Sequence, residues 1–452
     1  MLSQKPAMDA LSSLCEEFRK NNHIDPADYE KYQVKRGLRN ADGSGVVAGL
    51  TSVCNVHGFV ISEGERQPQE GQLIYRGISI EDFVEGARAE NRFGFEEAIW
   101  LLFFGHLPTT AQIQAFTELL SHRRELPDSF NEDIIIKASS PNIMNKLQRS
   151  VLALYSYDPN PEDMSMENII RQSIDLIAQI PTMMVNSYQV KRHNYDGETM
   201  FFHAHDPKHT TAEHILSSLR YDRKFTDAEA KLLDMCLTLH AEHGGGNNST
   251  FAARVLSSSG TDTYSALSAA IGSLKGPKHG GANIKVMEML GYIKAEVKDI
   301  HDRDEIAAFL GKLIRKEAGD RSGLIYGMGH AVYTLSDPRA KILRENARAL
   351  TAEKNLEDDF ALLEAVEELT PQVFFEEKSA SKTVCANVDL YSGLVYKSLG
   401  IPEDLYTPIF AVARMAGWCA HRIEEVLSGG RIIRPAYKAV SGLREYVPTK
   451  SR

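Results

Sequence analysis

Apolar residues recur at helical spacing along most of the chain, and this pattern limits its fold more than any other feature. Residues 95–104 form a compact apolar segment that Gly105 and Pro108 end, and residues 409–427 form a longer one that stops at Gly429-Gly430. Strand-like stretches are few and cover residues 71–75, 46–60, 324–325 and 431–433. We therefore predict a mainly α protein with minor β content.

Size and charge exclude several classes of function. A chain of 452 residues can bury a large core and form more than one lobe. Its formal net charge of −10 argues against nucleic acid or an anionic membrane as the main partner. An acidic protein that binds an anion must gather its cations locally, so arginines within apolar stretches become informative.

The cysteines and the N-terminus predict the compartment. The chain has 5 cysteines without CxxC spacing, which indicates free thiols in a reducing environment. The densest apolar stretch, residues 98–104, is far shorter than the roughly 20 residues that a bilayer requires. The first twenty residues have neither the apolar block of a signal peptide nor the acid-poor character of a transit peptide. We expect a cytoplasmic protein without a membrane segment.

Three histidines stand among glycines. His243 lies in the segment 242–247 (EHGGGN), His279 in the segment 276–283 (GPKHGGAN) and His330 in the segment GMGHA. Glycines let the backbone approach a ligand closely and adopt positive φ. One such histidine is typical of a loop beside a helix cap, but three in one chain favour side chains that reach into a cleft.

A carboxylate and three arginines complete the set of candidates. Asp389 precedes a helical stretch, so it is either a helix N-cap or a general base whose apolar surroundings raise its pKa. Arg339 lies in a first helical turn, where a cation opposes the helix dipole, and Arg414 interrupts an apolar stripe. With Arg434 they form a set that suits a dicarboxylate, although each arginine could pair with a structural carboxylate instead.

The alternative constellation is a metal site. His240 and His243 are three residues apart, and further histidines crowd the polar segment 192–214, which we expect to be an exposed insertion: His193, His203, His205, His209 and His214. Zinc needs three or four converging ligands, and the chain has no HExxH motif. We therefore expect no metal.

Taken in order, these loops resemble the citrate synthase family. Residues 327–339 (GMGHAVYTLSDPR) are similar to the family signature in which Gly-x-Gly-His leads to Asp-Pro-Arg. Residues 276–283 resemble the other catalytic-histidine loop, residues 387–393 (NVDLYSG) the segment of the catalytic aspartate, and residues 240–247 the remaining histidine loop. The similarity extends over roughly residues 71–440, with the motifs in the order and spacing of the family.

The resemblance implies a role for each candidate. Asp389 would remove a methyl proton from acetyl-CoA, His279 would stabilise the enol at the thioester oxygen, and His330 would polarise the ketone of oxaloacetate and protonate the new alkoxide. Oxaloacetate would be held by His243, Arg339, Arg414 and, from the neighbouring subunit, Arg434. The resemblance implies no metal or redox cofactor, and coenzyme A enters as part of the substrate.

The resemblance also implies a two-lobed, mainly α homodimer. Its large domain would comprise residues 1–280, including an N-terminal extension, and residues 392–452, and its small domain residues 281–391. Closure of the lobes would assemble the site and exclude water. Thr334 occupies a position that is basic in some family members, which leaves the contacts of the CoA phosphates open.

Several activities share these motifs. A 2-methylcitrate synthase, which uses propionyl-CoA, differs by one methylene, and a pocket discriminates one methylene by only about 1–3 kcal/mol. A catalytically silent homologue that binds oxaloacetate and acyl-CoA is a second alternative, although it would not need Asp389, His279 and His330 together. A metal-dependent hydrolase built on the histidines is a third.

Overall fold

The structure is a computed structural model that describes residues 5–62, 65–378 and 384–452. The chain folds as two compact units. Unit 1 combines the chain up to Gly49 with Ile433–Arg452, and unit 2 is Leu50–Ile432. All helices discussed below as parts of the candidate site belong to unit 2.

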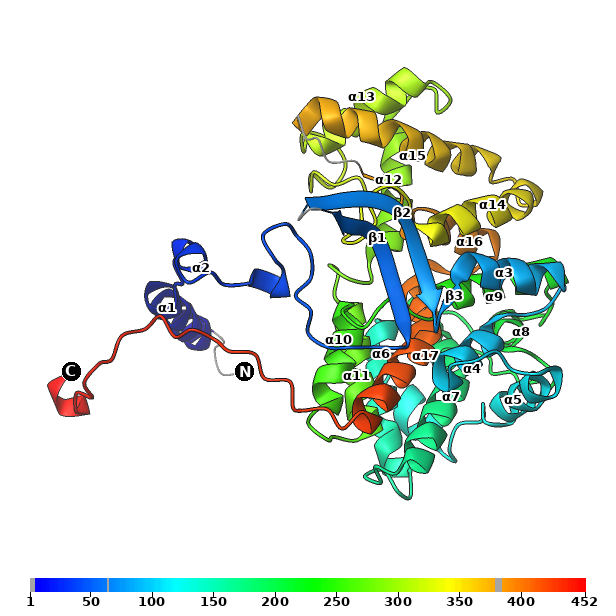
Figure 1. Cartoon of the computed structure of the whole chain (residues 1–452), viewed down its shortest axis with the longest axis horizontal. Coiled ribbons are helices and arrows are strands. Elements are labelled where there is room, and N and C mark those ends of the chain that lie inside the picture. Colours follow the sequence, from blue (N-terminus) through cyan, green and yellow to red (C-terminus); the bar gives the residue numbers. More distant parts are fainter. Residues whose placement is uncertain (1–4, 63–64, 379–383) are drawn as a thin grey trace. The chain divides into compact units, whose positions relative to one another are not determined.

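Unit 1 contains short helical elements joined by irregular chain. They are α1 (Lys5–Asn21), α2 (Ala27–Lys31) and the 3₁₀ turns η1 (Arg36–Leu38) and η5 (Thr449–Ser451), labelled in part in Figure 1. Leu11, Leu14 and Phe18 follow helical spacing along α1, and each is more than half exposed.

A small antiparallel sheet opens unit 2. It consists of β1 (Cys54–Ser62), β2 (Glu65–Tyr75) and β3 (Ile78–Ser79), in the order β1-β2-β3. Cys54 pairs with Tyr75, and the register shifts between His57 and Phe59. Leu73 and Tyr75 are fully buried, so one face of this hairpin packs on the helices.

Helices make up nearly all of the rest of unit 2. In chain order they are α3 (Ile80–Ala89), α4 (Phe95–Phe104), α5 (Thr110–His122), the π-helical turn η2 (Asn131–Ile136), α6 (Ile143–Ala153), the 3₁₀ turn η3 (Leu154–Tyr157), α7 (Met166–Asp196), α8 (Thr211–Leu219), α9 (Asp227–His240), α10 (Asn248–Ser257), α11 (Thr263–Lys275), α12 (Ala282–Glu296), α13 (Arg303–Ile314), α14 (Pro338–Glu353), α15 (Glu357–Lys378), α16 (Asp389–Ser398), the 3₁₀ turn η4 (Glu403–Leu405) and α17 (Tyr406–Leu427).

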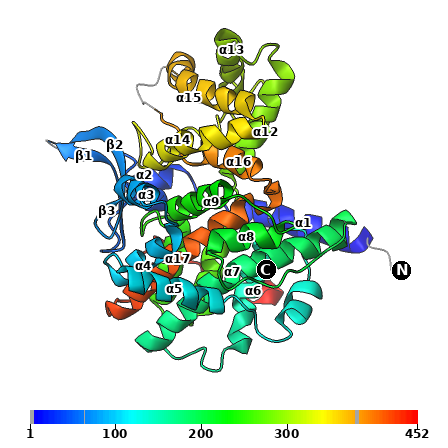
Figure 2. The same cartoon turned by 90° about the vertical axis from the view of Figure 1, so that its right-hand side faces the viewer.

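Helix α17 is the central element of the core. Its residues from Tyr406 to Arg422 are buried with the single exception of Phe410, because the helix packs against α4, α7 and α9, labelled in Figure 2, and against α10 and α11, labelled in Figure 1. A helix that is apolar on all sides is stable only inside a protein. Buried polar side chains on α17 therefore need hydrogen-bond partners, and Arg414 and His421 are two such side chains.

Helices α12 to α16 form a second group within unit 2. Helix α13 packs on α15, while α12 and α14 both pack on α16 (Figure 1). This group covers most of the predicted small domain, residues 281–391. The division into unit 1 and unit 2 falls elsewhere and does not test that boundary, which stays a prediction.

The mainly α prediction is confirmed, with corrections at the level of single elements. Helix α4 ends at Gly105, whose φ of +78° only glycine adopts easily, and α17 ends before Gly429, as predicted. The strands predicted at 324–325 and 431–433 are wrong, since both segments are irregular. The segment 192–214 is not one exposed insertion, because α7 extends to Asp196 and His214 is buried in α8. No helix within the three described ranges combines the length and the apolar character that crossing a bilayer requires.

Candidate active site

The turn after α9 places His243 at the centre of the candidate site. His243 is buried, and its Nε2 lies 3.2 Å from the hydroxyl of Tyr333. Its ring meets that of His330 edge-on, with the centroids 5.1 Å apart. Burial lowers the pKa of His243 well below its usual value, and Arg339, His330 and Arg414 add to this effect. His243 is therefore neutral.

His330 is held by its own loop. Its Nδ1 accepts the backbone N–H groups of Val332 (3.0 Å) and Tyr333 (3.1 Å), and its ring stacks on Tyr333 with the centroids 4.6 Å apart. Because a backbone N–H can only donate, Nδ1 carries the lone pair and the ring proton lies on Nε2. A neutral imidazole in this tautomer is a hydrogen-bond donor through Nε2.

The loop of His330 is joined to the loop that precedes Asp389. Gly327 O accepts the backbone N–H of Asn387 (2.8 Å), and the Asn387 side chain donates from Nδ2 to Gly329 O (2.9 Å). Gly327 has φ +80°, and a Cβ there would lie 2.9 Å from Leu390 Cα. The two loops can therefore approach so closely only with glycine at this position.

Asp389 is the first residue of α16 and not its N-cap, which is Val388. The N-cap interpretation of Asp389 was therefore wrong. Asn387 Oδ1 accepts the Asp389 backbone N–H at 3.0 Å, so the amide that binds the His330 loop also fixes the start of α16. Burial raises the pKa of Asp389 to about 6, against the opposing effect of Arg339 and Arg414. Such a carboxylate is a stronger base than an ordinary one.

The histidine after α11 has a different anchor. His279 Nε2 lies 2.9 Å from Ser249 Oγ and accepts the Ser249 backbone N–H at 3.4 Å. Since that N–H can only donate, the lone pair of His279 is on Nε2 and its proton on Nδ1. Burial lowers the pKa of His279 to about 4, and Arg414 adds to this effect. His279 is neutral at physiological pH and offers Nδ1–H as a donor.

The two candidate arginines that lie in unit 2 differ in their hydrogen-bond partners. Arg339 is buried and bonds its own helix cap, with Nε and Nη2 3.0 and 2.7 Å from the carboxylate oxygens of Asp337. The interpretation as a partner of a structural carboxylate thus applies to Arg339. Arg414 is fully buried and donates only from Nε, to His240 O at 2.6 Å; neither Nη1 nor Nη2 has a hydrogen-bond partner among the described residues.

Arg414 is the charge that connects the candidates. It acts on the pKa of Asp389, His243 and His279, and His330 lies against His243. Leaving two guanidinium nitrogens buried without an acceptor is costly, so an anion is the natural partner at this point. Arg434 lies in unit 1 and is exposed, and the structure does not place it relative to these groups.

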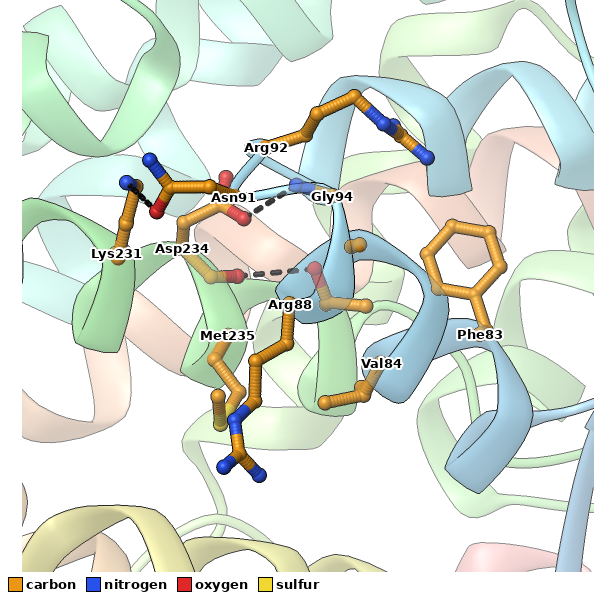
Figure 3. Close-up of a pocket in the computed structure, with 11 residues that line it drawn as sticks. Phe83, Val84, Arg88, Asn91, Arg92, Gly94, Lys231, Asp234 and Met235 are labelled. Carbon is orange, nitrogen blue, oxygen red and sulfur yellow. Dashed lines mark hydrogen bonds between the residues drawn. The ribbon is translucent and has the colours of Figure 1, made fainter.

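Two of the cavities in unit 2 bear on the location of the site. One, of about 270 Å³, opens beside His330 and Tyr333 and is lined further by Ile325, Phe374 and Lys378. A smaller one, of about 90 Å³, lies between α3 and α9 (Figure 3). None of the candidate residues lines the smaller cavity, where Asp234 is already bonded to the Gly94 backbone.

Comparison with known proteins decides the family. The family model described as citrate synthase, C-terminal domain, matches residues 41–436. The 2-methylcitrate synthase 1 of Corynebacterium glutamicum is 34% identical over 93% of this chain and 99% of its own. The chain belongs to the citrate synthase family. The citrate synthase of Synechocystis sp. is likewise 34% identical, over 85% of this chain and 89% of its own.

Solved citrate synthases share the fold. The structure from Thermotoga maritima matches with a TM-score of 0.73 at 27% identity, over 93% of this chain and 99% of that one. A ternary complex of the Thermoplasma acidophilum enzyme with carboxymethyl coenzyme A and oxaloacetate matches with a TM-score of 0.75 at 26% identity and the same coverage. The predicted family resemblance and the mainly α, two-lobed citrate synthase fold are thus confirmed.

Sequence reasoning missed several residues that hold the candidate site together. Tyr333 stands within the signature segment but carries no charge, and Ser249 follows the His243 loop without any distinguishing pattern. Glu242 precedes His243 without a signal of its own in the sequence, although it is fully buried. The histidines of segment 192–214 are not ligands of a metal site in the described part of the chain, where no three metal-binding side chains converge.

Proposed function

We propose that the protein is a citrate synthase, which condenses acetyl-CoA with oxaloacetate and, with one water, releases citrate and CoA. The observation that carries this proposal is the fully buried Arg414, whose Nη1 and Nη2 lack acceptors in the described structure and whose charge acts on Asp389, His243 and His279. A dicarboxylate bound there would be presented to one base and to neutral donors at the same time.

Asp389 is proposed as the base that removes a methyl proton of acetyl-CoA. Its pKa of about 6 leaves it ionised at neutral pH while making it a better proton acceptor than an ordinary carboxylate. The α-proton of a thioester is weakly acidic, so a base is effective only if the developing oxyanion meets a donor. His279, with its proton on Nδ1, would supply that donor.

His330 is proposed to act on oxaloacetate. Its Nε2–H would polarise the ketone, and the carbanion equivalent of acetyl-CoA would attack the ketone carbon to form the new C–C bond. His330 would then protonate the resulting alkoxide, and water would cleave the thioester to release CoA. Both histidines can serve as neutral donors because burial keeps the pKa of His279 low and the His330 ring accepts two backbone N–H groups through Nδ1.

Four groups are proposed to bind oxaloacetate: His243, Arg339, Arg414 and, from a neighbouring subunit, Arg434. Arg414 would meet one carboxylate through its two terminal nitrogens, which is the geometry that guanidinium and carboxylate share. Arg339 would contribute its remaining Nη1, because Asp337 already engages Nε and Nη2. Fixing the electrophile in this way turns an encounter into an intramolecular-like reaction.

Acyl-CoA would enter through the cavity beside His330. Its lining combines apolar Ile325 and Phe374, which suit the pantetheine chain, with the ammonium group of Lys378. The related Thermoplasma acidophilum enzyme forms its ternary complex with a CoA derivative and oxaloacetate together. We propose that no metal or redox cofactor takes part, that the protein is a cytoplasmic homodimer with a site shared between subunits, and that nucleic acid and membranes are not partners.

A second candidate function is 2-methylcitrate synthase. Curated relatives named 2-methylcitrate synthase match this chain as well as citrate synthases do, at 34% identity in both Corynebacterium glutamicum and Shewanella oneidensis. Propionyl-CoA differs from acetyl-CoA by one methylene, so the same catalytic groups serve both thioesters.

Release of free thiol from the two thioesters tests both functions. We expect release to require oxaloacetate, to persist in a strong chelator and to be faster with acetyl-CoA than with propionyl-CoA. A clear preference for propionyl-CoA would establish the second candidate function instead. Absence of oxaloacetate-dependent release from both would indicate a silent homologue, and loss of activity with the chelator would indicate a metal-dependent enzyme. Asp389→Ala is the matched control, in which release should vanish while oxaloacetate still binds.

A further inference from the structure

Helix α17 holds the turn that presents His243 at three successive points. Arg414, Gly417 and His421 are spaced by three and four residues, so they lie on one face of the helix. Their partners, in the same order, are His240 O at 2.6 Å, Ala241 O at 3.1 Å and Glu242 Oε1 at 2.9 Å. His243 directly follows the three bonded turn residues 240–242, so this face of α17 determines where the His243 imidazole lies.

The protonation of His421 follows from Arg254. Arg254 Nη2 lies 2.6 Å from His421 Nδ1, and a guanidinium nitrogen can only donate. Nδ1 therefore accepts, and Nε2 carries the proton that is donated to Glu242. Arg254 is itself fixed by ion pairs with Glu424 and with Glu425, the latter at 2.7 Å. The orientation of His421, which is fully buried, is thus set from both sides.

Two opposite charges in this region are incompletely satisfied. Glu242 Oε2 and both terminal nitrogens of Arg414 lack hydrogen-bond partners within the described ranges, and both residues are fully buried. They already interact, since Glu242 is the neighbour that most opposes the lowering of the Arg414 pKa by burial. In a medium of low dielectric constant such a pair would close into a salt bridge unless something restrained it.

The restraint on Glu242 is visible in its other oxygen. Oε1 accepts the Gly244 backbone N–H at 2.5 Å and the His421 Nε2–H at 2.9 Å. The first bond joins two residues of the same turn, so it does not fix the carboxylate relative to α17. The second bond comes from His421, seven residues beyond Arg414 on α17, and ties the carboxylate to that part of the helix.

We propose that His421, oriented by Arg254, is a positioning residue that prevents Glu242 from forming a salt bridge with Arg414 and so keeps Arg414 available for a carboxylate of the substrate. This inference rests on the proposed function, because it takes oxaloacetate as the anion that Arg414 meets. It adds a residue that touches neither substrate but controls the affinity for one of them.

Substitution of His421 tests the restraint. In His421→Leu we expect the dissociation constant of oxaloacetate, measured by calorimetry, to rise about tenfold, roughly the effect of one hydrogen bond to a charged group. The KM for oxaloacetate should rise in parallel, while kcat at saturating oxaloacetate falls less than about threefold, because a loss of binding that is equal in the ground state and the transition state leaves kcat unchanged. His421→Gln retains an N–H donor and should restore most of the affinity.

A second substitution separates restraint from mere packing. Glu242→Gln in the His421→Leu background removes the charge that competes for Arg414, so the dissociation constant should return to within about threefold of the wild-type value. If His421 served only to fill space, losing another buried group would weaken binding further. A double variant that binds no better than His421→Leu would overturn the proposal.

Controls keep each outcome decisive. His214→Leu removes another buried histidine, bonded to Thr182 and Ser218 in α7 and α8, and should lower the melting temperature without changing oxaloacetate affinity. If His421→Leu does not fold, Arg254→Gln should weaken binding in the same direction, and unchanged binding would contradict the inference. Wild-type protein that fails to bind oxaloacetate would refute the proposed function itself, whereas normal wild-type binding with an unaffected His421→Leu would refute only this inference.

Discussion

Asp389 shows how a single residue exchanges stability for reactivity. Its pKa is raised from 3.8 to about 6 by burial. A carboxyl whose folded pKa is raised contributes stability below its unfolded pKa and loses that contribution as the pH rises through the folded value. At neutral pH the ionised Asp389 therefore costs about 3 kcal/mol of folding free energy.

We predict that Asp389→Asn abolishes oxaloacetate-dependent thiol release and stabilises the fold. The gain in unfolding free energy should reach about 3 kcal/mol at pH 7.5 and shrink as the pH falls from 6 toward 3.8. Urea unfolding at pH 7.5 and 4.5 measures this difference. A variant that is equally stabilised at both pH values would show that the effect is packing rather than charge.

Arg414 is also a buried charge that lowers the stability of the fold, but its charge is positive. It is fully buried with one hydrogen bond, and its two terminal nitrogens lack acceptors in the described structure, a burial cost that an apolar residue of similar volume does not carry. We predict that Arg414→Met melts at or above the wild-type temperature without ligand but loses the stabilisation by oxaloacetate, which for the wild type is about 2.7 kcal/mol at 100 times Kd.

Arg422 is the matched control on the same helix. It is also fully buried, but its three nitrogens donate to Thr263, Ser257 and the Thr261 carbonyl. Arg422→Met leaves those acceptors without donors, so it should lower the melting temperature while keeping the response to oxaloacetate. If both variants lost stability equally, Arg414 would be a structural cation.

At the scale of elements, the approach of α17 to the turn 240–242 depends on Gly417. A Cβ at this position would lie 2.0 Å from Glu242 Oε2 and 2.5 Å from the Ala241 carbonyl, and that backbone cannot move away cheaply. We predict that Gly417→Ala destabilises the protein by about 1–3 kcal/mol and raises the KM for oxaloacetate, because the turn carries His243. Thermal unfolding and steady-state kinetics measure the two effects.

For Gly291 we expect the opposite effect of an alanine substitution on stability. Gly291 lies inside α12 and has open space around it, with no atom within 4 Å of the position that a Cβ would take. Gly291→Ala should stabilise the protein by about 0.5–1 kcal/mol through helix propensity alone and leave the KM unchanged. If Gly417→Ala behaved like Gly291→Ala, the close contact would not determine the position of the turn.

The same elements show what the sequence could predict. Helix ends such as Gly105 follow local rules, and the glycine-flanked histidines follow from backbone chemistry, so both were predictable. The bond of Arg339 to Asp337 and the role of Glu242 were not, because a charge pattern does not say which of several acceptors a guanidinium meets after folding. Asp389 lies at N1, one residue beyond the predicted N-cap, because local sequence signals locate a helix start only to within one or two residues.

At the scale of the whole molecule, Arg434 connects the proposed site to the proposed assembly. This residue lies in unit 1, beyond the last helix of unit 2, and is exposed in the single chain. An exposed arginine at the end of a chain can complete a site in a partner if the protein is a symmetric dimer. Two inactive variants can then restore each other, since each carries the group that the other lacks.

We predict that mixing Arg434→Ala with Asp389→Ala, under conditions that exchange subunits, restores activity that neither variant has alone. Random exchange makes half of the dimers hybrids, and each hybrid has one intact site of two, so the mixture should reach about a quarter of wild-type activity. Thiol release before and after exchange measures the recovery. The control mixes Asp389→Ala with His330→Ala. Both residues belong to the same subunit in every site, so each site of a hybrid lacks one of them and no activity should return. If the first mixture also recovered nothing although hybrids formed, Arg434 would serve its own subunit or no site at all.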